Sequence, residues 1–568
     1  MNRKIKKYFS GLGIKKYKDI DPDEIFLDSS NLPEFDTHQF EGRLEKPISK
    51  TSLIVLALFF VFIGMVYVSR VWALQVKGGD MYILKSEKNR LRNTLVFAER
   101  GIIYDRNEKE LAWNVLGEDT NFSFRKYVDI AGLGHVLGYV KYPSKDTYGF
   151  YYRPDFEGFD GIEKFYNDRL RGAHGLKIVE VDALGKIQSE NIIKPTKDGS
   201  NITLSIDAGV QNKLYEKIKE VATDLGFVGG AGVIMDVHTG EILASTSYPE
   251  YSSQVLTDGD NADLIKSYVN SKRRIFLNRV SNGTYTPGSI VKTVMAMGVL
   301  NEGVIDPNKK ILSTGSISLP NQYDDTKFSI FKDWKAHGWV DLKRALAVSS
   351  NVYFYEVGGG YKDQKGIGIA NIEKYAKLFG LGEKTGIDLP GEVSKPIPSP
   401  AWKAVNFPND QWRVGDTYNT VIGQYGFQVT PIQMARTVGA IANYGKVLQP
   451  SLLLGDTFSV PRVLRTLDIP RKYFDIVHEG MRDTVVSGSA PGLKFLSVEV
   501  AAKTGTAQVG RGNQYINSWL VGFFPYKNPK YSFAILMEEG DLEGGAASVR
   551  VMSQILDWMS VYVPEYIK

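Results

Sequence analysis

Residues 287–300 have the sequence PGSIVKTVMAMGVL. The Pro-Gly pair interrupts the preceding segment, and the almost wholly apolar run 294–300 predicts a helix that is buried on all sides. Ser289 would lie at the N-terminus of this helix, where the helix dipole favours developing negative charge. Lys292 lies three residues further on, faces the same way and can reach the serine oxygen. The stretch therefore predicts a serine nucleophile with an amine beside it.

A second motif, Ser349-Ser350-Asn351, offers groups that such a serine needs. A serine hydroxyl is a weak nucleophile until an adjacent base takes its proton. Lys292 can act as that base if burial and a nearby cation such as Lys503 lower its pKa. Ser349 is a candidate relay for the proton, and Asn351 is a candidate partner for Lys292 and for a substrate amide.

The third motif is Lys503-Thr504-Gly505-Thr506. The Lys503 ammonium and the hydroxyls of Thr504 and Thr506 suit a substrate carboxylate. Gly505 lets an extended peptide lie close against the strand edge. The backbone N–H groups of Ser289 and Thr506 would form an oxyanion hole.

The prediction of a serine enzyme depends on the three motifs occurring together and in this order, because each motif alone is weak evidence. S-x-x-K, S-x-N and K-T-G together are typical of penicillin-binding proteins and serine β-lactamases. A second S-x-x-K occurs at 329–332 and a second K-T-G at 384–386. The first is followed by Asp333 instead of a buried helix, and the second lies in a glycine-rich loop. Neither is predicted to be catalytic.

The pattern of apolar residues predicts an α+β catalytic domain that follows a mostly β pedestal. The region 73–200 alternates short β-like runs with turns. Beyond it, strands near both ends and helices between them favour one antiparallel sheet with helices on both faces. We expect hairpins at 232–245 and 519–538, and helices at 290–302, 341–357, 431–443 and 546–560.

Composition argues against several classes of function. The chain has 568 residues, a net charge of +5 and no block of lysine and arginine with interleaved aromatics, so we expect no nucleic-acid partner. It has no cysteine, which removes thiol nucleophiles and Cys-ligated metals. The six histidines are scattered without the spacing of metal ligands. We therefore expect neither a metal nor a cofactor.

One segment near the N-terminus predicts a membrane anchor. The run from Thr51 to Ser69 carries no charge, and apolar residues continue past Arg70 to Leu74. About 20 apolar residues are needed to cross the hydrocarbon core. Some fifty residues precede the run, which argues against a cleaved signal peptide. We expect a tail at 1–50, an anchor at 51–74, a pedestal at 75–200 and a catalytic domain at 201–568.

Further segments resemble class B penicillin-binding proteins from about Asn89 to the C-terminus. NRLR at 89–92 and RGIIYDRN at 100–107 are similar to the start of that family's non-catalytic pedestal. Segments similar to the end of the pedestal lie at 134–140, 161–164 and 170–172, and segments similar to the catalytic domain lie at 386–392, 422–424, 430–435 and 518–525.

The resemblance implies a peptidoglycan D,D-transpeptidase. It would transfer the acyl group of one stem peptide, through a Ser289 acyl-enzyme, to an amine on a neighbouring stem, and β-lactams would trap that serine. Lysines and arginines flank both sides of the anchor, so charge alone does not orient it. The chemistry implies a single-pass protein of the cytoplasmic membrane with its N-terminus inside and its catalytic domain outside.

The resemblance also bears on subgroup and partners. The pedestal and the segment 89–92 are closer to the cell-elongation subgroup than to the division subgroup. No glycosyltransferase domain fits between the anchor and residue 200, so we expect a separate membrane glycan polymerase of the shape, division or sporulation type. Two departures from the family are Thr293, where proline is usual after the lysine, and a short segment between Asn107 and Gly134, which lacks a head region that helps to dock partners.

Three alternatives remain at this point. A division-type transpeptidase shares the chemistry and differs in its partners. A membrane-bound β-lactamase needs a second base that activates a deacylating water, and we identify none. A penicillin-sensing protein needs a cytoplasmic output module, which a mixed-charge tail of fifty residues does not supply.

Overall fold

The computed structural model describes residues 49–82, 91–117, 122–147, 151–181, 187–321, 324–455 and 461–568. The chain separates into two compact units, and the second, Leu91–Lys568, contains the pedestal and the catalytic domain. The predicted tail lies almost wholly outside the described residues. The segment boundaries at residues 50, 74 and 200 stay predictions.

The first unit contains the apolar helix α1, Lys50–Trp72, which continues as a π-helical turn, η3, Ala73–Lys77. Ser49 caps the helix, because its hydroxyl accepts a hydrogen bond from the backbone N–H of Ser52. Within the described part of the chain, this is the one helix that is long and apolar enough to cross a membrane, and its side chains are not buried in the protein. The helix agrees with the predicted anchor.

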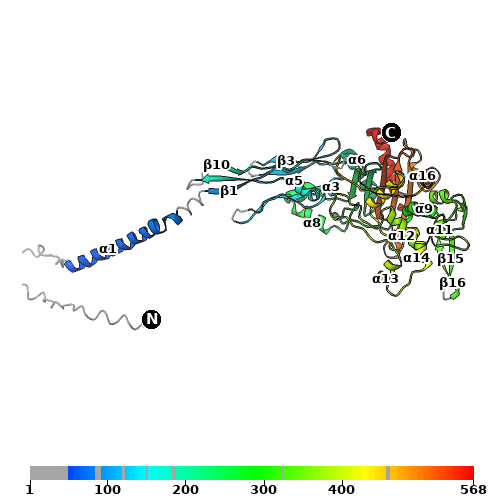
Figure 1. Cartoon of the computed structure of the whole chain (residues 1–568), viewed down its shortest axis with the longest axis horizontal. Helices are drawn as coiled ribbons and strands as arrows, with labels where there is room; N and C mark the ends of the chain where they lie inside the picture. The colour runs from blue at the N-terminus through cyan, green and yellow to red at the C-terminus, as the bar shows by residue number, and fades with distance from the viewer. Residues whose placement is uncertain are drawn as a thin grey trace, which may run out of the picture. The chain divides into compact units, whose positions relative to one another are not determined.

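The pedestal at the start of the second unit is mostly β, as predicted (Figure 1). It holds two sheets, with strand orders β1-β9-β10 and β11-β2-β3-β4, and short two-stranded ladders. Its elements are β1 (Leu91–Val96), β2 (Ile103–Tyr104), β3 (Glu110–Leu116), β4 (Ser123–Tyr127), α3 (Gly134–Leu137), β5 (Val140–Lys141), β6 (Ser144–Lys145), β7 (Tyr151–Arg153), β8 (Glu157–Gly158), α4 (Gly161–Phe165), α5 (Asn167–Leu170), β9 (Gly175–Val181), β10 (Ile187–Lys194) and β11 (Ile202–Thr203).

A buried carboxylate joins distant parts of the pedestal. Glu163 on α4 accepts a hydrogen bond from Arg100 Nε at 2.6 Å and from Arg125 Nε of β4 at 2.8 Å. All three side chains are almost completely buried. Burial alone would raise the pKa of Glu163, but the two guanidiniums hold it below its ordinary value.

The catalytic domain is built on a five-stranded antiparallel sheet of order β13-β12-β22-β21-β20. The two predicted hairpins lie side by side in it, because β12 pairs with β22. Strand β20, which carries the K-T-G motif, is the last strand of the sheet, so its outer edge pairs with no further strand of the described chain. The strands are β12 (Gly229–Asp236), β13 (Ile242–Tyr248), β20 (Ala501–Val509), β21 (Tyr515–Phe524) and β22 (Tyr531–Gly540).

Helices cover both faces of this sheet, as predicted (Figure 1). The other elements of the domain are α6 (Ala208–Asp224), α7 (Ser253–Asp258), α8 (Ala262–Asn270), η4 (Gly288–Val291), α9 (Lys292–Asn301), β14 (Ile311–Ser313), β15 (Ser316–Asn321), β16 (Asp324–Lys332), β17 (Gly338–Val340), α10 (Leu342–Ala347), α11 (Asn351–Gly359), α12 (Gly368–Leu378), α13 (Pro400–Asn406), α14 (Val414–Val421), α15 (Pro431–Ala442), β18 (Lys446–Leu448), β19 (Val463–Thr466), α16 (Arg471–Val486), η5 (Pro491–Leu493), η6 (Arg511–Asn513), η7 (Leu542–Gly544), α17 (Ala547–Tyr562) and η8 (Pro564–Tyr566).

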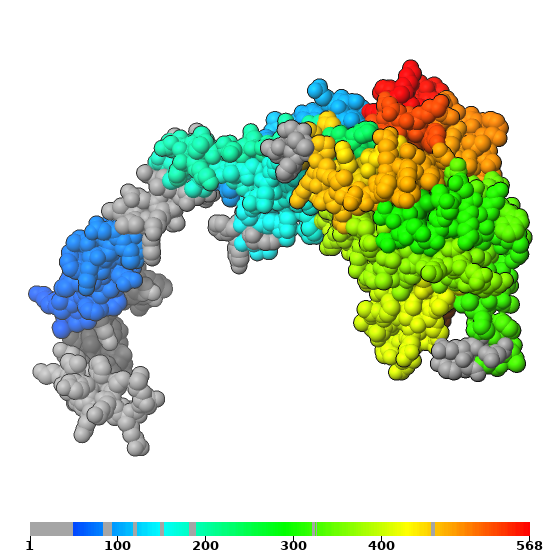
Figure 2. Space-filling model, turned by 45° about the vertical axis from the view of Figure 1, so that its right-hand side comes forward, coloured from blue at the N-terminus to red at the C-terminus, as the bar shows by residue number. Residues whose placement is uncertain are grey.

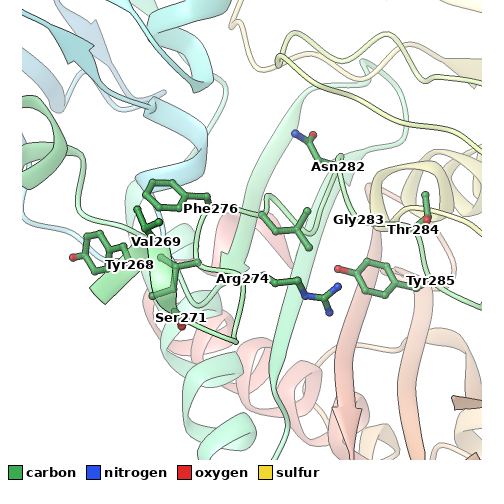
Figure 3. Close-up of a pocket in the computed structure, with 11 residues that line it drawn as sticks. Tyr268, Val269, Ser271, Arg274, Phe276, Asn282, Gly283, Thr284 and Tyr285 are labelled. Carbon is green, nitrogen blue, oxygen red and sulfur yellow. The ribbon is translucent and has the colours of Figure 1, made fainter. Parts of the chain in front are cut away.

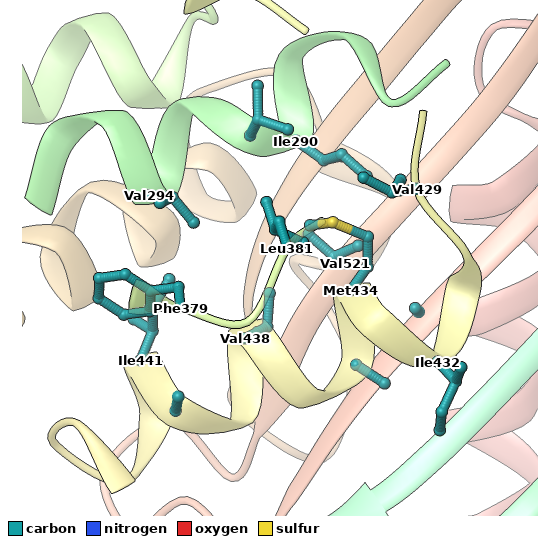
Figure 4. Close-up of a cluster of buried hydrophobic side chains, with 14 of the residues drawn as sticks. Ile290, Val294, Phe379, Leu381, Val429, Ile432, Met434, Val438, Ile441 and Val521 are labelled. Carbon is teal, nitrogen blue, oxygen red and sulfur yellow. The ribbon is translucent and has the colours of Figure 1, made fainter. Parts of the chain in front are cut away.

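The sheet separates two hydrophobic cores, because successive strand residues point to opposite faces. Along β21, Trp519 and Val521 pack into one core, whereas Leu520 packs into the other, under α6 and α17. In the first core, α15 presents Met434 and Val438 toward the turn and helix that carry the candidate serine (Figure 4). The predicted all-round burial of α9 is confirmed from Lys292 to Leu300.

The helix expected at 341–357 is instead two helices, α10 and α11. They are separated at Ser349, whose backbone has φ +60 and so lies in the left-handed region. Ser350 then caps α11, because its Oγ accepts a hydrogen bond from the N–H of Tyr353 at 3.3 Å. The helical pattern of apolar residues did not reveal this interruption, which turns the S-x-N motif toward the edge of the sheet.

Candidate active site

Ser289 lies in η4, the turn that leads into α9, and its side chain is partly exposed. Two glycines bring this turn against the edge of β20. Gly288 has φ +58, and a Cβ there would lie 3.1 Å from the carbonyl oxygen of Thr506. A Cβ on Gly505 would lie 2.8 Å from the carbonyl oxygen of Pro287. The serine therefore lies directly beside the K-T-G strand.

Lys292 is fully buried one turn after the serine. Its Nζ donates to the carbonyl oxygen of Ser349 at 2.9 Å and to Asn351 Oδ1 at 2.7 Å. Burial lowers the pKa of Lys292 to about 7, although the carboxylate of Asp333 opposes this shift. A lysine in this state is a usable base near neutral pH.

Lys503 reaches the same motif from β20. Its Nζ donates to Ser349 Oγ at 2.8 Å and to the carbonyl oxygen of Thr504 at 2.8 Å. Burial, together with the positive charge of Lys292, lowers the pKa of Lys503. Ser349 thus contacts both lysines, one through its carbonyl and one through its hydroxyl, and its left-handed backbone makes both contacts possible.

The side chains of Thr504 and Thr506 alternate with those of Lys503 and Gly505 along β20, so they lie on the opposite face of the strand. Thr504 Oγ1 lies 2.5 Å from Ser489 Oγ, and the side chain of Thr506 is exposed. The carbonyl of Thr506 faces Gly288. Because the N–H and C=O of a strand residue face the same edge, the N–H of Thr506 also faces the turn that carries Ser289.

Sequence reasoning did not identify Asp333 as part of the site. Its buried carboxylate accepts hydrogen bonds from Ser350 Oγ at 2.8 Å, from the N–H of Val352 at 3.0 Å and from Ser313 Oγ at 3.2 Å. It therefore fixes the start of α11 and supplies the negative charge behind Lys292. The sequence signal for Asp333 was its place directly after the second S-x-x-K. The sequence analysis used that place only to argue that no buried helix follows residues 329–332.

The two additional motif matches do not join the site. Ser329 lies exposed on β16, in a hairpin that projects from the same side of the domain as α13 (Figures 1 and 2). Thr385 of the second K-T-G is buried, and its N–H and hydroxyl both donate to Glu392 at 2.6 Å. Among the described residues, no group of three or more His, Asp or Glu side chains is arranged to hold a metal ion.

Comparison with known families supports what this geometry suggests. The model of the penicillin-binding protein transpeptidase domain matches residues 230–557, which is more than half of the chain. The chain belongs to this family. The model of the penicillin-binding protein dimerisation domain matches residues 120–204, so the pedestal expected for class B members is also shown.

Curated relatives place the chain within the family. It is 32% identical to the peptidoglycan D,D-transpeptidase MrdA of Acinetobacter baumannii, over 73% of this chain and 63% of that protein. It is 32% identical to MrdA of Salmonella typhimurium, over 77% of this chain and 73% of that protein. It is 27% identical to MrdA of Escherichia coli, over 90% of this chain and 94% of that protein.

Solved structures agree with this assignment. Helicobacter pylori PBP2 in its complex with MreC matches with a TM-score of 0.69 and 26% identity, over 84% of this chain and 99% of that one. Pseudomonas aeruginosa PBP2 in complex with WCK 5153 matches with a TM-score of 0.69 and 27% identity, over 84% of this chain and 98% of that one. This penicillin-binding protein is a serine-type peptidoglycan D,D-transpeptidase of the elongation subgroup, as the sequence indicated.

Proposed function

We propose that Ser289 is the nucleophile of this transpeptidase and that Lys292 is its general base. The observation that carries this proposal is the hydrogen bonding of Lys292. A neutral amine has two N–H donors and one lone pair, and the carbonyl of Ser349 and the amide of Asn351 accept both donors. The lone pair is left for the proton of Ser289.

The proton then passes through the reaction as follows. Lys292 takes the hydroxyl proton while Ser289 Oγ forms a bond to the carbonyl carbon of the penultimate D-alanine. The bond from that carbon to the nitrogen of the terminal D-alanine breaks. The leaving nitrogen receives a proton from Ser349 Oγ, which Lys503 replenishes through its 2.8 Å hydrogen bond. An amine of a second stem peptide later attacks the ester carbonyl carbon, and the bond from that carbon to Ser289 Oγ breaks. Lys292 returns its proton to Ser289 Oγ, and the proton lost by the amine passes through Ser349 to Lys503.

The remaining site residues have binding roles in this proposal. The N–H groups of Ser289 and Thr506 stabilise the oxyanion, because both belong to backbone segments that meet at Gly288. The hydroxyls of Thr504 and Thr506 bind the terminal carboxylate of the donor stem. Lys503 is completely buried, so it acts on that carboxylate through Ser349, to which its Nζ donates, and not by direct contact.

Labelling with a fluorescent penicillin tests the nucleophile. The full-length protein in detergent should be labelled at one residue and should release the label slowly. Ser289→Ala should lose the label, and Ser329→Ala, in the second S-x-x-K, should be labelled like the unmodified protein. Equal labelling of Ser289→Ala would overturn the assignment, and rapid turnover of the penicillin would favour a β-lactamase.

We further propose that the N-terminus lies inside the cell, that the catalytic domain lies outside, and that a separate membrane polymerase of the shape type makes the glycan strands. The anchor helix and the extracellular chemistry support the orientation. The described part of the chain between α1 and residue 200 is occupied by the pedestal, and the similar H. pylori protein forms a complex with MreC.

The absence of cysteine makes the orientation easy to test. In spheroplasts, a membrane-impermeant maleimide should label the single-cysteine variant Lys527→Cys, on the exposed turn between β21 and β22. It should not label Ser10→Cys in the tail until the membrane is permeabilised. The reverse pattern would refute the orientation.

A further inference from the structure

Two hydroxyl groups meet on the face of β20 that carries the threonines of the K-T-G motif. Thr504 Oγ1 lies 2.5 Å from the Oγ of Ser489, a residue of the segment between α16 and η5. Each hydroxyl has one proton to donate and lone pairs that accept. One proton lies between the two oxygens, so only one of the two hydroxyls keeps a proton for another acceptor. Thr504 can donate to a ligand only if Ser489 donates to Thr504.

The backbone around Ser489 fixes the position of its hydroxyl. The N–H of Ser489 donates to the carbonyl oxygen of Ala347, in α10, at 3.1 Å. The preceding residue, Gly488, packs so closely that a Cβ there would lie 2.2 Å from the same oxygen. Ala347 precedes Ser349 by two residues. The segment that holds Ser489 therefore connects the S-x-N motif to the K-T-G strand.

The cations near β20 leave direct contact with a substrate carboxylate to hydroxyl groups. Lys503 is completely buried. Figure 3 shows Arg274 in the wall of a pocket lined by residues 268–285, which precede the serine turn, and this arginine is paired with Glu538 and Glu539. The strength with which the site binds a carboxylate therefore depends on where the hydroxyl protons point, and the proton of Thr504 is one of them.

We propose that Ser489 is a positioning residue for recognition of the donor carboxylate. Ser489 donates its proton to Thr504 Oγ1 and so directs the proton of Thr504 toward the terminal carboxylate of the donor stem. The inference rests on the proposed function, in which Thr504 binds that carboxylate. In the opposite arrangement Thr504 would present only lone pairs to the anion. A hydroxyl that accepts one hydrogen bond is also the stronger donor in the next.

Two compounds that differ only at the carboxyl group test the role of Ser489. They are benzylpenicillin, whose carboxylate stands for that of the terminal D-alanine, and its methyl ester. The rate of acylation by each is measured with the full-length protein in detergent, and the ratio of the two rates reports recognition of the carboxylate. Ser489→Ala should lower this ratio about five- to tenfold, because a hydrogen bond that orients the charge-binding hydroxyl is lost. A merely structural role would slow both reactions equally, and an unchanged ratio would overturn the inference.

A conservative variant and a matched control sharpen this experiment. Ser489→Thr should keep the ratio, because threonine retains the donor and the adjoining pocket of about 270 Å³ has room for a methyl group. Ser553 lines the same pocket, but its Oγ donates to the carbonyl of Gly492 at 3.1 Å. Ser553→Ala should therefore keep the ratio of the unmodified protein. A ratio in either variant as low as that of Ser489→Ala would contradict the proposal.

A double variant tests whether Ser489 acts through Thr504. Thr504→Val alone should lower the ratio, since it removes the hydroxyl that binds the carboxylate. Addition of Ser489→Ala should lower it no further, because the two residues act as one unit. Additive losses would overturn the inference and leave the proposed function intact. A ratio that Thr504→Val does not change would overturn the carboxylate role in the proposed function as well, and only labelling of Ser289→Ala would refute the nucleophile.

Discussion

The pH dependence of acylation should report the pKa of Lys292. With a pKa of about 7, about half of the amine is neutral at pH 7 and about a tenth at pH 6, whereas an ordinary lysine would have about one molecule in 3,000 neutral at pH 7. Below pH 7 the rate of penicillin acylation should therefore rise about tenfold per pH unit, and above pH 8 it should be nearly constant.

Substitution of Asp333 should move this profile. Its carboxylate raises the pKa of Lys292, so Asp333→Asn should shift the midpoint to lower pH and increase the rate at pH 6 relative to the plateau. Asparagine keeps one oxygen that can accept from Ser350 and Val352. Asp341→Asn is the control, because Asp341 also caps a helix, accepting from the N–H of Arg344 at 2.8 Å.

The assay is the rate of fluorescent-penicillin labelling from pH 5.5 to 9 at constant ionic strength. The Asp341→Asn midpoint should match that of the unmodified protein. If the rate still rises tenfold per pH unit up to pH 9, Lys292 has an ordinary pKa and burial does not activate it. If Asp333→Asn leaves the midpoint unchanged, the carboxylate does not act on Lys292.

Three further substitutions test the surrounding structure. Gly288→Ala should slow acylation about tenfold, because alanine resists a left-handed backbone by about 1–2 kcal/mol; an unchanged rate would show that the turn is not held there. Asn351→Ala should reduce acylation by about tenfold or more, since one acceptor that orients the amine is lost, while the midpoint of thermal unfolding should change little. Glu163→Gln should lower the unfolding free energy by about 3–5 kcal/mol, because Arg100 and Arg125 stay buried without a counter-ion; urea denaturation that shows no loss would contradict the importance of this network.

Local patterns in the sequence predicted much of the fold because they reflect burial. The apolar run after Lys292 predicted a helix that is packed on all sides, and pairs of β-like runs separated by turns predicted two hairpins. The membership in a known family was also predictable, since three motifs occur in order. The break at Ser349 was not, because the left-handed backbone there goes with contacts to Lys292 and Lys503, which lie in distant parts of the chain. Asp333 was missed for the same reason.

The pairing of β12 with β22 has a consequence for synthesis of the protein. It joins residues about 300 positions apart, and β22 and α17 come almost last in the chain. The middle of the sheet therefore stays unfilled until β22 has been synthesised. Ser289 is synthesised long before the β12–β22 strand pair that supports it can form. A nascent chain that lacks β22 should therefore not be acylated by penicillin, and acylation should begin only after β22 has been added to the sheet.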